Sequence, residues 1–314
     1  MGDAGEGTVP GYEPRAGPVA ADGASVCDMP HTLGLRQVDV FASGPLTGNP
    51  VAVVHDADDL TDDRMAAFAR WTNLSETTFL LAPTHVRADY RVRIWTPGGE
   101  LPFAGHPTLG TAHAWLEAGG VPRTEGAVVQ ECGVGNVTLR RGAPGGPDAG
   151  RLAFAGPPLL RSGSVAPEDL AHLARALRVP VSDVVDAAWV DNGPGWVAAL
   201  LPDAAAVLAV EPDLAAFGDL KIGVVGPYEP GESDAAVEVR AFVPGLGVAE
   251  DPVTGSLNAG IGEWLAGPVL PESYVASQGT VLGRRGRVHV RRDTDGVVWV
   301  GGDTVTTISG SVTL

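Results

Sequence analysis

The chain has 314 residues, 44% of them hydrophobic and 19% charged, which is typical of a globular protein with room for two domains. Its net charge of −17 argues against a nucleic-acid partner, whose phosphates need a basic surface, and no apolar run reaches the roughly 18 residues that span a membrane. The two cysteines, Cys27 and Cys132, provide no disulfide framework and fit a reducing cytoplasm.

The N-terminal segment, residues 1–32, is rich in Gly, Ala, Pro and acidic residues. It lacks the basic start and apolar centre of a secretory signal. Because it has too little apolar content to bury, we expect a disordered tail.

Residues 33–148 are predicted to form a first domain. Thr61 fits the N-cap of a helix that runs to about Arg70. A second helix over 108–117 is almost uncharged, so it should be buried on all sides. The predicted strands around it lie at 35–41, 51–54, 77–81, 90–95 and 128–140, with a further strand at 151–154.

A stretch rich in Gly, Pro and Asp, residues 142–150, marks the predicted boundary to a second domain over 149–302. Leucines at helical spacing predict a helix over 167–177, and an almost uncharged helix is expected over 255–265. The pattern alone does not say where the last strand, 304–314, pairs; we assign 303–314 to the first domain.

The two predicted domains repeat one another. The strand at 92–97 leads through a Gly-rich loop to a helix ending in Trp115-Leu116, and the strand at 239–244 leads in the same way to a helix ending in Trp264-Leu265. We therefore expect an α+β fold of two pseudo-symmetric domains, each a barrel-like, mostly antiparallel sheet around a central helix. A cleft between such domains is a natural ligand site.

Both central helices begin in a loop that could bind an anion. The first loop reads Gly105-His106-Pro107-Thr108 and the second reads Asp251-Pro252-Val253-Thr254-Gly255-Ser256. Free N–H groups and the helix dipole attract negative charge. If the domains face each other, a small carboxylate substrate fits there; the alternative, about equally weighted, is two ordinary helix starts.

Glu76 precedes the apolar strand at 77–81, and the duplication breaks at this acid, because the corresponding part of the second domain reads Leu220-Lys221-Ile222. A single unpaired carboxylate suits a residue that both removes and returns a proton, and partial burial would raise its pKa toward neutrality. The alternative is a solvated residue at the end of a strand.

We expect His106 and Asp251 to stand at corresponding positions at the entries of the two helices; the alternatives are a core histidine at His106 and an N-cap at Asp251. His113 lies seven residues after His106 and is interpreted as a core residue. The remaining histidines have no metal-ligand spacing, so we expect no metal. Phosphate-loop, dinucleotide and nucleophile-elbow motifs are not found in the sequence.

Several motifs in the same order resemble the phenazine-biosynthesis isomerase (PhzF-like) family. The resemblance covers about 33–314 and rests on Val38-Asp39-Val40-Phe41, Gly48-Asn49-Pro50-Val51-Ala52-Val53-Val54, Ser75-Glu76-Thr77-Thr78-Phe79, Phe103-Ala104-Gly105-His106-Pro107-Thr108, Glu250-Asp251-Pro252-Val253-Thr254-Gly255-Ser256, Gln278-Gly279, Arg284-Arg285-Gly286 and Val300-Gly301-Gly302.

The resemblance implies a diaminopimelate-epimerase-like fold and a cofactor-independent enzyme that is often a homodimer. It places the catalytic Glu on Glu76 and the substrate-orienting residues on His106, Asp251 and Ser256. The related epimerases carry two cysteines where this chain has Gly105 and Asp251, which puts a two-thiol mechanism in doubt.

The resulting hypothesis is an isomerase that moves a proton between carbons of a small unsaturated metabolite bearing amino or carboxyl groups, in specialised-metabolite biosynthesis. Glu76 would carry the proton, while His106, Asp251 and Ser256, with Gly105, Thr108 and Gly255 at the helix starts, would bind the substrate. Two alternatives stay open. One is an epimerase or racemase, which needs a second acid–base group from His106 or Asp251; the other is a non-catalytic binding protein.

Overall fold

The computed structural model describes residues 31–314 except Pro147 and Gly247. The predicted tail therefore lies outside the described residues apart from its last two positions. The second of these, Thr32, already belongs to the first strand, where it pairs with Thr313. Cys27 also lies outside the described part.

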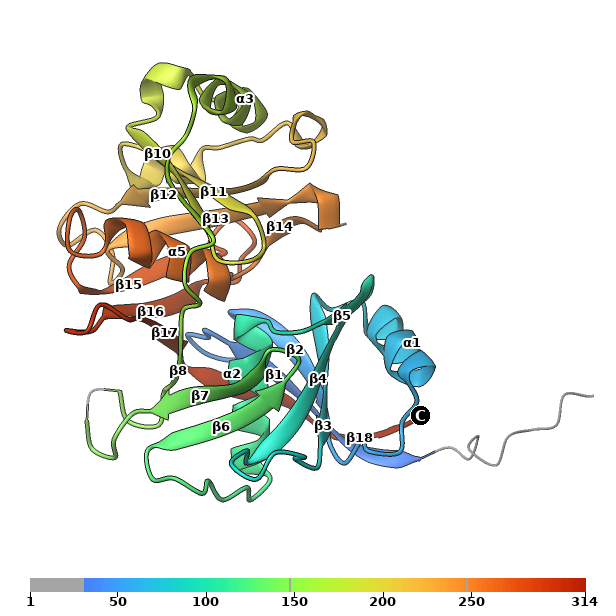
Figure 1. The fold of residues 1–314 in the computed structure, drawn as a ribbon. Helices are drawn as coiled ribbons and strands as arrows, with labels where there is room; N and C mark the ends of the chain where they lie inside the picture. The colour runs from blue at the N-terminus through green and yellow to red at the C-terminus, as the bar shows by residue number, and fades with distance from the viewer. Residues whose placement is uncertain (1–30, 147, 247) are drawn as a thin grey trace, which may run out of the picture.

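The first half of the molecule surrounds one central helix with strands, and Figure 1 shows it as the blue and green part. Its elements are β1 (Thr32–Val40), β2 (Asn49–Val54), α1 (Asp62–Thr72), β3 (Glu76–Leu81), β4 (Tyr90–Thr96), β5 (Gly99–Leu101), α2 (Gly105–Glu117), β6 (Ala127–Cys132) and β7 (Gly135–Arg141), and β8 (Leu152–Ala155) leads from it into the second half. Thr61 caps α1 as predicted, by accepting a hydrogen bond from the Arg64 N–H.

The second half has the same design. Its elements are β9 (Arg161–Ser164), α3 (Pro167–Leu177), β10 (Asp186–Asp191), β11 (Trp196–Leu200), α4 (Ala204–Leu208), β12 (Lys221–Pro227), β13 (Val237–Val243), β14 (Val248–Asp251), α5 (Gly255–Leu265), β15 (Ser273–Gln278), β16 (Gly286–Arg292) and β17 (Val298–Gly302), with short 3₁₀ turns at Val181–Asp183, Leu214–Ala216 and Pro244–Leu246. The last strand of the chain is β18 (Thr304–Thr313).

Strand pairing repeats between the halves. From β1 to β7 the successive pairs β1–β2, β2–β3, β3–β4, β4–β5, β4–β6 and β6–β7 are antiparallel, parallel, antiparallel, antiparallel, parallel and antiparallel. From β10 to β16 the corresponding pairs follow the same order of directions. The predicted duplication and the mostly antiparallel α+β architecture are thus present in the hydrogen bonding.

Two strands join the halves. β8 pairs with β7 on one side and with β17 on the other, so the sheet continues from one half into the next. β18 returns to the first half and pairs with β1 along its length. We propose on this basis the division of the described chain into 33–148 with 303–314, and 149–302.

The helices α2 and α5 lie inside the two halves, because small and apolar side chains cover almost their whole surface. In α2 the residues from Gly105 to Ala112 are buried, and in α5 only Ser256, Glu263 and Trp264 are partly accessible. The main apolar core includes Leu109 of α2 and Leu257 of α5. Smaller clusters pack α1 and α3 against the outer faces of the sheets. Among the described residues no helix is both long and apolar enough to cross a bilayer.

Candidate active site between the central helices

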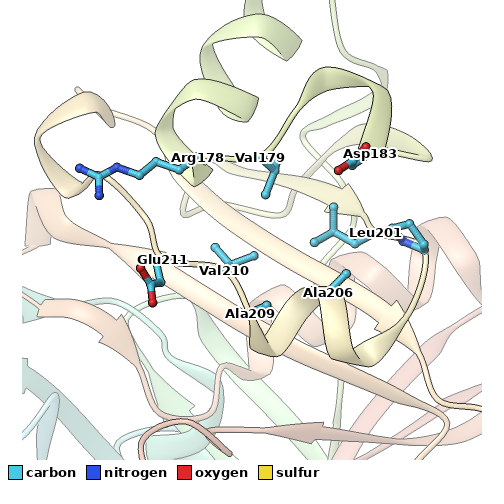
Figure 2. A pocket seen from close by; sticks show the side chains of 9 residues that line it. Arg178, Val179, Asp183, Leu201, Ala206, Ala209, Val210 and Glu211 are labelled. Atoms are coloured by element: carbon cyan, nitrogen blue, oxygen red, sulfur yellow. The ribbon is translucent and has the colours of Figure 1, made fainter.

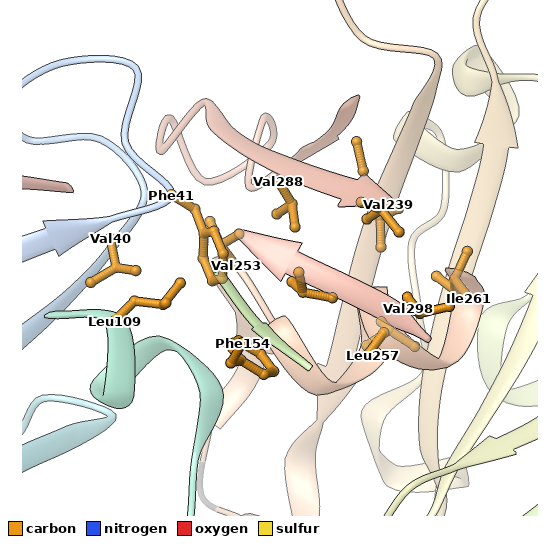
Figure 3. Close-up of a cluster of buried hydrophobic side chains, with 14 of the residues drawn as sticks. Val40, Phe41, Leu109, Phe154, Val239, Val253, Leu257, Ile261, Val288 and Val298 are labelled. Carbon is orange, nitrogen blue, oxygen red and sulfur yellow. The ribbon is translucent and has the colours of Figure 1, made fainter. Parts of the chain in front are cut away.

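The N-termini of α2 and α5 meet over one aromatic ring, that of Phe154 in β8. A Cβ atom added to Gly105 would lie 2.6 Å from Cζ of Phe154, and one added to Gly255 would lie 3.1 Å from the same atom. Figure 3 shows Phe154 between Leu109 of α2 and Leu257 of α5. Glycine at both helix starts therefore allows the two helices to approach a common point.

Glu76 and His106 lie side by side at this point. Glu76 is the first residue of β3, and His106 is the second residue of α2. Oε2 of Glu76 lies 3.4 Å from Nε2 of His106, with side chains 16% and 6% exposed. Neither atom has a hydrogen-bond partner within the described part of the chain. Glu76 is thus mostly buried beside the imidazole ring, with a carboxyl oxygen that no described residue binds.

Burial shifts the pKa values of the three ionisable groups at the site. Desolvation, followed by repulsion from Asp251, raises the pKa of Glu76 to about 8. Desolvation also raises the pKa of Asp251 to about 6, and it lowers the pKa of His106 to about 3. Near neutral pH the imidazole is therefore uncharged, while Glu76 can change its protonation state readily.

Asn49 connects this pair to Asp251 of the second half. Its Nδ2 donates to Oδ1 of Asp251 over 3.0 Å and to the carbonyl of Val253 over 2.9 Å, and it lies 3.4 Å from Nδ1 of His106. Asn49 is fully buried at the start of β2. The amide therefore fixes the position of Asp251 relative to the first half.

Gln278 performs a similar task within the second half. Its Oε1 accepts hydrogen bonds from the Thr254 N–H and from Asn258, and its Nε2 donates to the carbonyl of Asp251 and to Oγ1 of Thr254. Oγ1 of Thr254 donates in turn to Oδ2 of Asp251 over 2.5 Å. Sequence reasoning placed neither Asn49 nor Gln278 at the site, although both lie in the quoted motifs.

Ser256 stands at the start of α5, in the same place that His106 has in α2. Its Oγ accepts a hydrogen bond from Nε1 of Trp196 over 3.0 Å, and its carbonyl accepts one from Asn192 over 2.9 Å. The hydroxyl proton of Ser256 is left to donate. No side-chain cap is found at the start of α2 or α5 among the described residues.

Two sequence-based expectations need correction. His106 and Asp251 are not equivalents: counted from the helix starts, His106 matches Ser256, while Asp251 ends β14 as Leu101 ends β5. Nor does Asp251 cap α5, since Thr254 occupies the N-cap position.

Thr108 does not reach the site with its side chain. It is completely buried, and its Oγ1 accepts a hydrogen bond from Gln130 in the interior of the first half. His113 is only half-buried rather than a core residue, because its ring forms hydrogen bonds with Thr304 and Thr306 of β18.

A hollow of about 410 Å³ lies elsewhere, between α3 and α4 on the second half, and none of the predicted site residues line it (Figure 2). Its walls include Val179, Leu201 and Val210; of its charged residues, Arg178 and Glu211 lie at one end and Asp183 lies toward the other (Figure 2). In the described part of the chain no group of three His, Cys, Asp or Glu residues is placed to hold a metal ion.

Replacing Asn49 by alanine is expected to weaken the association of the two halves of the molecule. The change leaves Oδ1 of Asp251 and the Val253 carbonyl without this donor, so we expect the free energy of unfolding to fall by about 1–3 kcal/mol and turnover to fall with it. Denaturant unfolding and steady-state kinetics measure both. Asn136→Ala, at an exposed position, is the matched control; equal behaviour of the two variants would contradict the bridging role of Asn49.

The fold and the site define a duplicated two-barrel protein with a carboxyl group of raised pKa near the starts of its central helices. Residues 38–310 match the family model described as phenazine biosynthesis-like protein. The chain belongs to this family. It is 36% identical over 267 residues to the trans-2,3-dihydro-3-hydroxyanthranilate isomerase of Pseudomonas aeruginosa, covering 82% of this chain and 90% of that protein. Several further relatives are named as isomerases, and the chain is a PhzF-like isomerase.

A relative with a different kind of name is antisense-enhancing sequence 1 of the fission yeast Schizosaccharomyces pombe, 36% identical and covering 88% of this chain and 97% of that one. Among solved structures, a PhzF-family phenazine biosynthesis protein of Bacillus anthracis has a TM-score of 0.75 at 23% identity, covering 90% of this chain and 99% of its own. A predicted epimerase of Pseudomonas aeruginosa has a TM-score of 0.70 at 28% identity, covering 89% and 99%.

Proposed function

We propose that this chain moves a proton between two carbons of a small, unsaturated, carboxyl-bearing metabolite, with Glu76 as the proton carrier and without a cofactor. The observation that carries the proposal is the state of Glu76. It is buried, its pKa is raised to about 8, and its Oε2 has no hydrogen-bond partner in the described chain. A carboxyl group with these properties can act as a base in one step and as an acid in the next.

In the proposed reaction the Glu76 carboxylate removes a proton from a carbon next to a double bond. The electrons of the broken C–H bond move into the unsaturated system. The resulting carboxylic acid then returns its proton to a carbon at the other end of that system. Atoms and charge balance without an oxidant or a metal, and neutral His106 lies beside the carboxyl group, with its Nε2 3.4 Å from Oε2 of Glu76.

In this proposal Asp251, Ser256, Gly105 and Gly255 would line the substrate-binding space. Asp251 and the hydroxyl of Ser256 would bind its polar groups, and the first N–H groups of α2 and α5 would bind its anionic part. The name of the Pseudomonas aeruginosa relative suggests a substrate like trans-2,3-dihydro-3-hydroxyanthranilate, used in specialised-metabolite biosynthesis. We also infer a cytoplasmic enzyme, because its two cysteines provide no disulfide framework, and a homodimer, as the family resemblance implies.

An epimerase remains the second candidate because one solved relative carries that name. It needs a second acid–base group on the opposite face of the substrate. His106 does not meet this requirement, since it lies beside Glu76 and its pKa is about 3. Asp251, with a pKa of about 6, is the group that remains.

Incubation with trans-2,3-dihydro-3-hydroxyanthranilate in heavy water tests the proposal. We expect isomerisation with deuterium on the receiving carbon, at least in part, as seen by proton NMR. A product with inverted configuration and unmoved double bonds would favour the epimerase. Absence of any reaction would contradict the proposed substrate class.

The reaction should need neither a metal nor a thiol. The one described cysteine, Cys132, ends β6, and burial raises its pKa, which leaves little thiolate at neutral pH. A chelator and a thiol alkylator should both leave the rate unchanged in a turnover assay. Inhibition by alkylation that a Cys132→Ser variant escapes would show the opposite.

A further inference from the structure

The chain contains one lysine, Lys221, among twenty arginines. An ammonium group differs from a guanidinium in being a compact point charge on a flexible stem, with three donors that can rotate toward a ligand. This lone residue begins β12, close to the start of the second central helix.

Lys221 occupies the position in the second half that Glu76 has in the first. β2 and β3 run parallel, with Val51 paired to Glu76, the first residue of β3. β11 and β12 also run parallel, with Trp196 paired to Lys221, the first residue of β12. The duplication therefore places a cation in the second half where the first half has its acid–base carboxyl.

The side chain of Lys221 leaves the sheet on the face that α5 covers. Side chains alternate along a strand, so Lys221 and Gly223 share one face. A Cβ atom added to Gly223 would lie 2.4 Å from Cδ1 of Leu257 in α5. The paired residue Trp196 lies at the same level and donates to Ser256, the second residue of α5. Lys221 thus stands at the start of α5, as Glu76 stands at the start of α2.

Lys221 has donors to spare. Its Nζ donates to the carbonyl of Pro194 over 2.5 Å, which uses one of three N–H groups. It makes no ion pair with a carboxylate in the described part of the chain, and it is partly buried. On the same wall, Asn192 is 7% exposed; its Nδ2 donates to the Ser256 carbonyl, while its Oδ1 has no partner among the described residues. This wall therefore offers a positive charge without an anion.

We propose that Lys221 binds the carboxylate of the substrate on the second-half side of the candidate site, so that this enzyme is specific for acids. The inference rests on the proposed proton-shift function. Near neutral pH the ionised Asp251 repels an anionic group, whereas the Lys221 ammonium and the first turn of α5 attract it. The substrate would then lie with its carboxylate toward Lys221 and its reacting carbons toward Glu76.

Because the chain has one lysine, growth on [¹⁵N-ζ]lysine gives a single side-chain signal. Anthranilate is the acid probe, and 2-aminobenzamide, in which an uncharged amide replaces the carboxylate, is the matched control. We expect the Lys221 Nζ signal to shift in a saturable way with anthranilate and not with the amide. A Lys221 Nζ chemical shift that does not change with anthranilate, or changes equally with both probes, would overturn the proposal.

Lys221→Met and Lys221→Arg provide a second test. Losing a hydrogen bond to a charged group should raise the Kd of anthranilate and the KM of trans-2,3-dihydro-3-hydroxyanthranilate about 10–100-fold, with kcat nearly unchanged. The Arg variant should lose less than tenfold, and the amide should bind all three proteins alike. Equal weakening of acid and amide in Lys221→Met would instead mean that Lys221 only holds the loop at Pro194.

The two proposals fail in different ways. If the wild type isomerises trans-2,3-dihydro-3-hydroxyanthranilate and Lys221→Met does so with an unchanged KM, the proposed role of Lys221 is wrong and the proposed function stands. A wild type that shifts its Lys221 signal with anthranilate but does not isomerise the acid overturns the proposed function and leaves Lys221 as a carboxylate-binding residue.

Discussion

Glu76→Gln is expected to lower kcat by about 10²–10⁴-fold, the range typical of lost general acid–base catalysis. The amide has the shape of the carboxyl group but cannot exchange a proton with carbon. Its fold should persist, because Oε2 of Glu76 has no hydrogen bond to lose in the described structure. Steady-state kinetics and thermal unfolding of the purified variant measure the two effects.

Two comparisons make this result specific. Glu125→Gln, at an exposed position, should keep the wild-type rate. Anthranilate should still bind to Glu76→Gln, since the groups at the start of α5 are unchanged. Near-normal turnover by Glu76→Gln would exclude the proposed role, and an unfolded variant would make Glu76 a structural strand-end residue.

The rate should depend steeply on pH. The base must be ionised to accept the first proton, and the pKa of Glu76 is about 8. Below that value kcat/KM should fall about tenfold for each pH unit, so that the rate constant at pH 6 is about a hundredth of the plateau. A pH–rate profile from 5.5 to 9.5 measures this, and a flat profile between 6 and 8 would contradict the raised pKa.

The contribution of Glu76 to the stability of the fold should decrease as the pH rises, whereas kcat/KM increases. Burial raises the pKa of Glu76 from 4.5 in the unfolded chain to about 8 in the folded one, so the folded state binds the proton more tightly between these values. The contribution is complete below pH 4.5 and is lost as the pH rises through 8. The melting temperature of the wild type should therefore fall relative to that of Glu76→Gln as the pH rises across this window. Parallel plots of melting temperature against pH for the two proteins would show that Glu76 is not buried in solution.

Much of the fold follows from local patterns. α3 and α5 begin and end where periodicity and small residues predicted, at 167–177 and 255–265. The strand at 304–314 was also predicted from alternation, but its partner was not, because alternation does not specify a neighbour far away in the sequence. Pairing of this kind is decided by the whole arrangement of the sheets.

At the site, the sequence predicted Glu76 with a raised pKa and the meeting of the two helix starts. It missed Asn49 and Gln278, because a buried amide leaves no periodic signal and acts only through partners from other elements. It also included Thr108, whose position one turn into α2 directs the side chain to Gln130. The direction of a side chain in a helix depends on its distance from the first helical residue, and the sequence did not define that residue for α2.

The return of β18 to β1 has a consequence for how the chain acquires its shape during synthesis. The half that contains Glu76 gains its outer strand from residues 304–313, which leave the ribosome after all of the second half. Domains usually fold in the order in which they are made. Here the second half can close first, while the first half keeps an open strand edge until the distant segment arrives. Contacts between segments so far apart in the sequence form slowly. We therefore expect the newly made chain to be most prone to aggregation while this strand edge is unpaired.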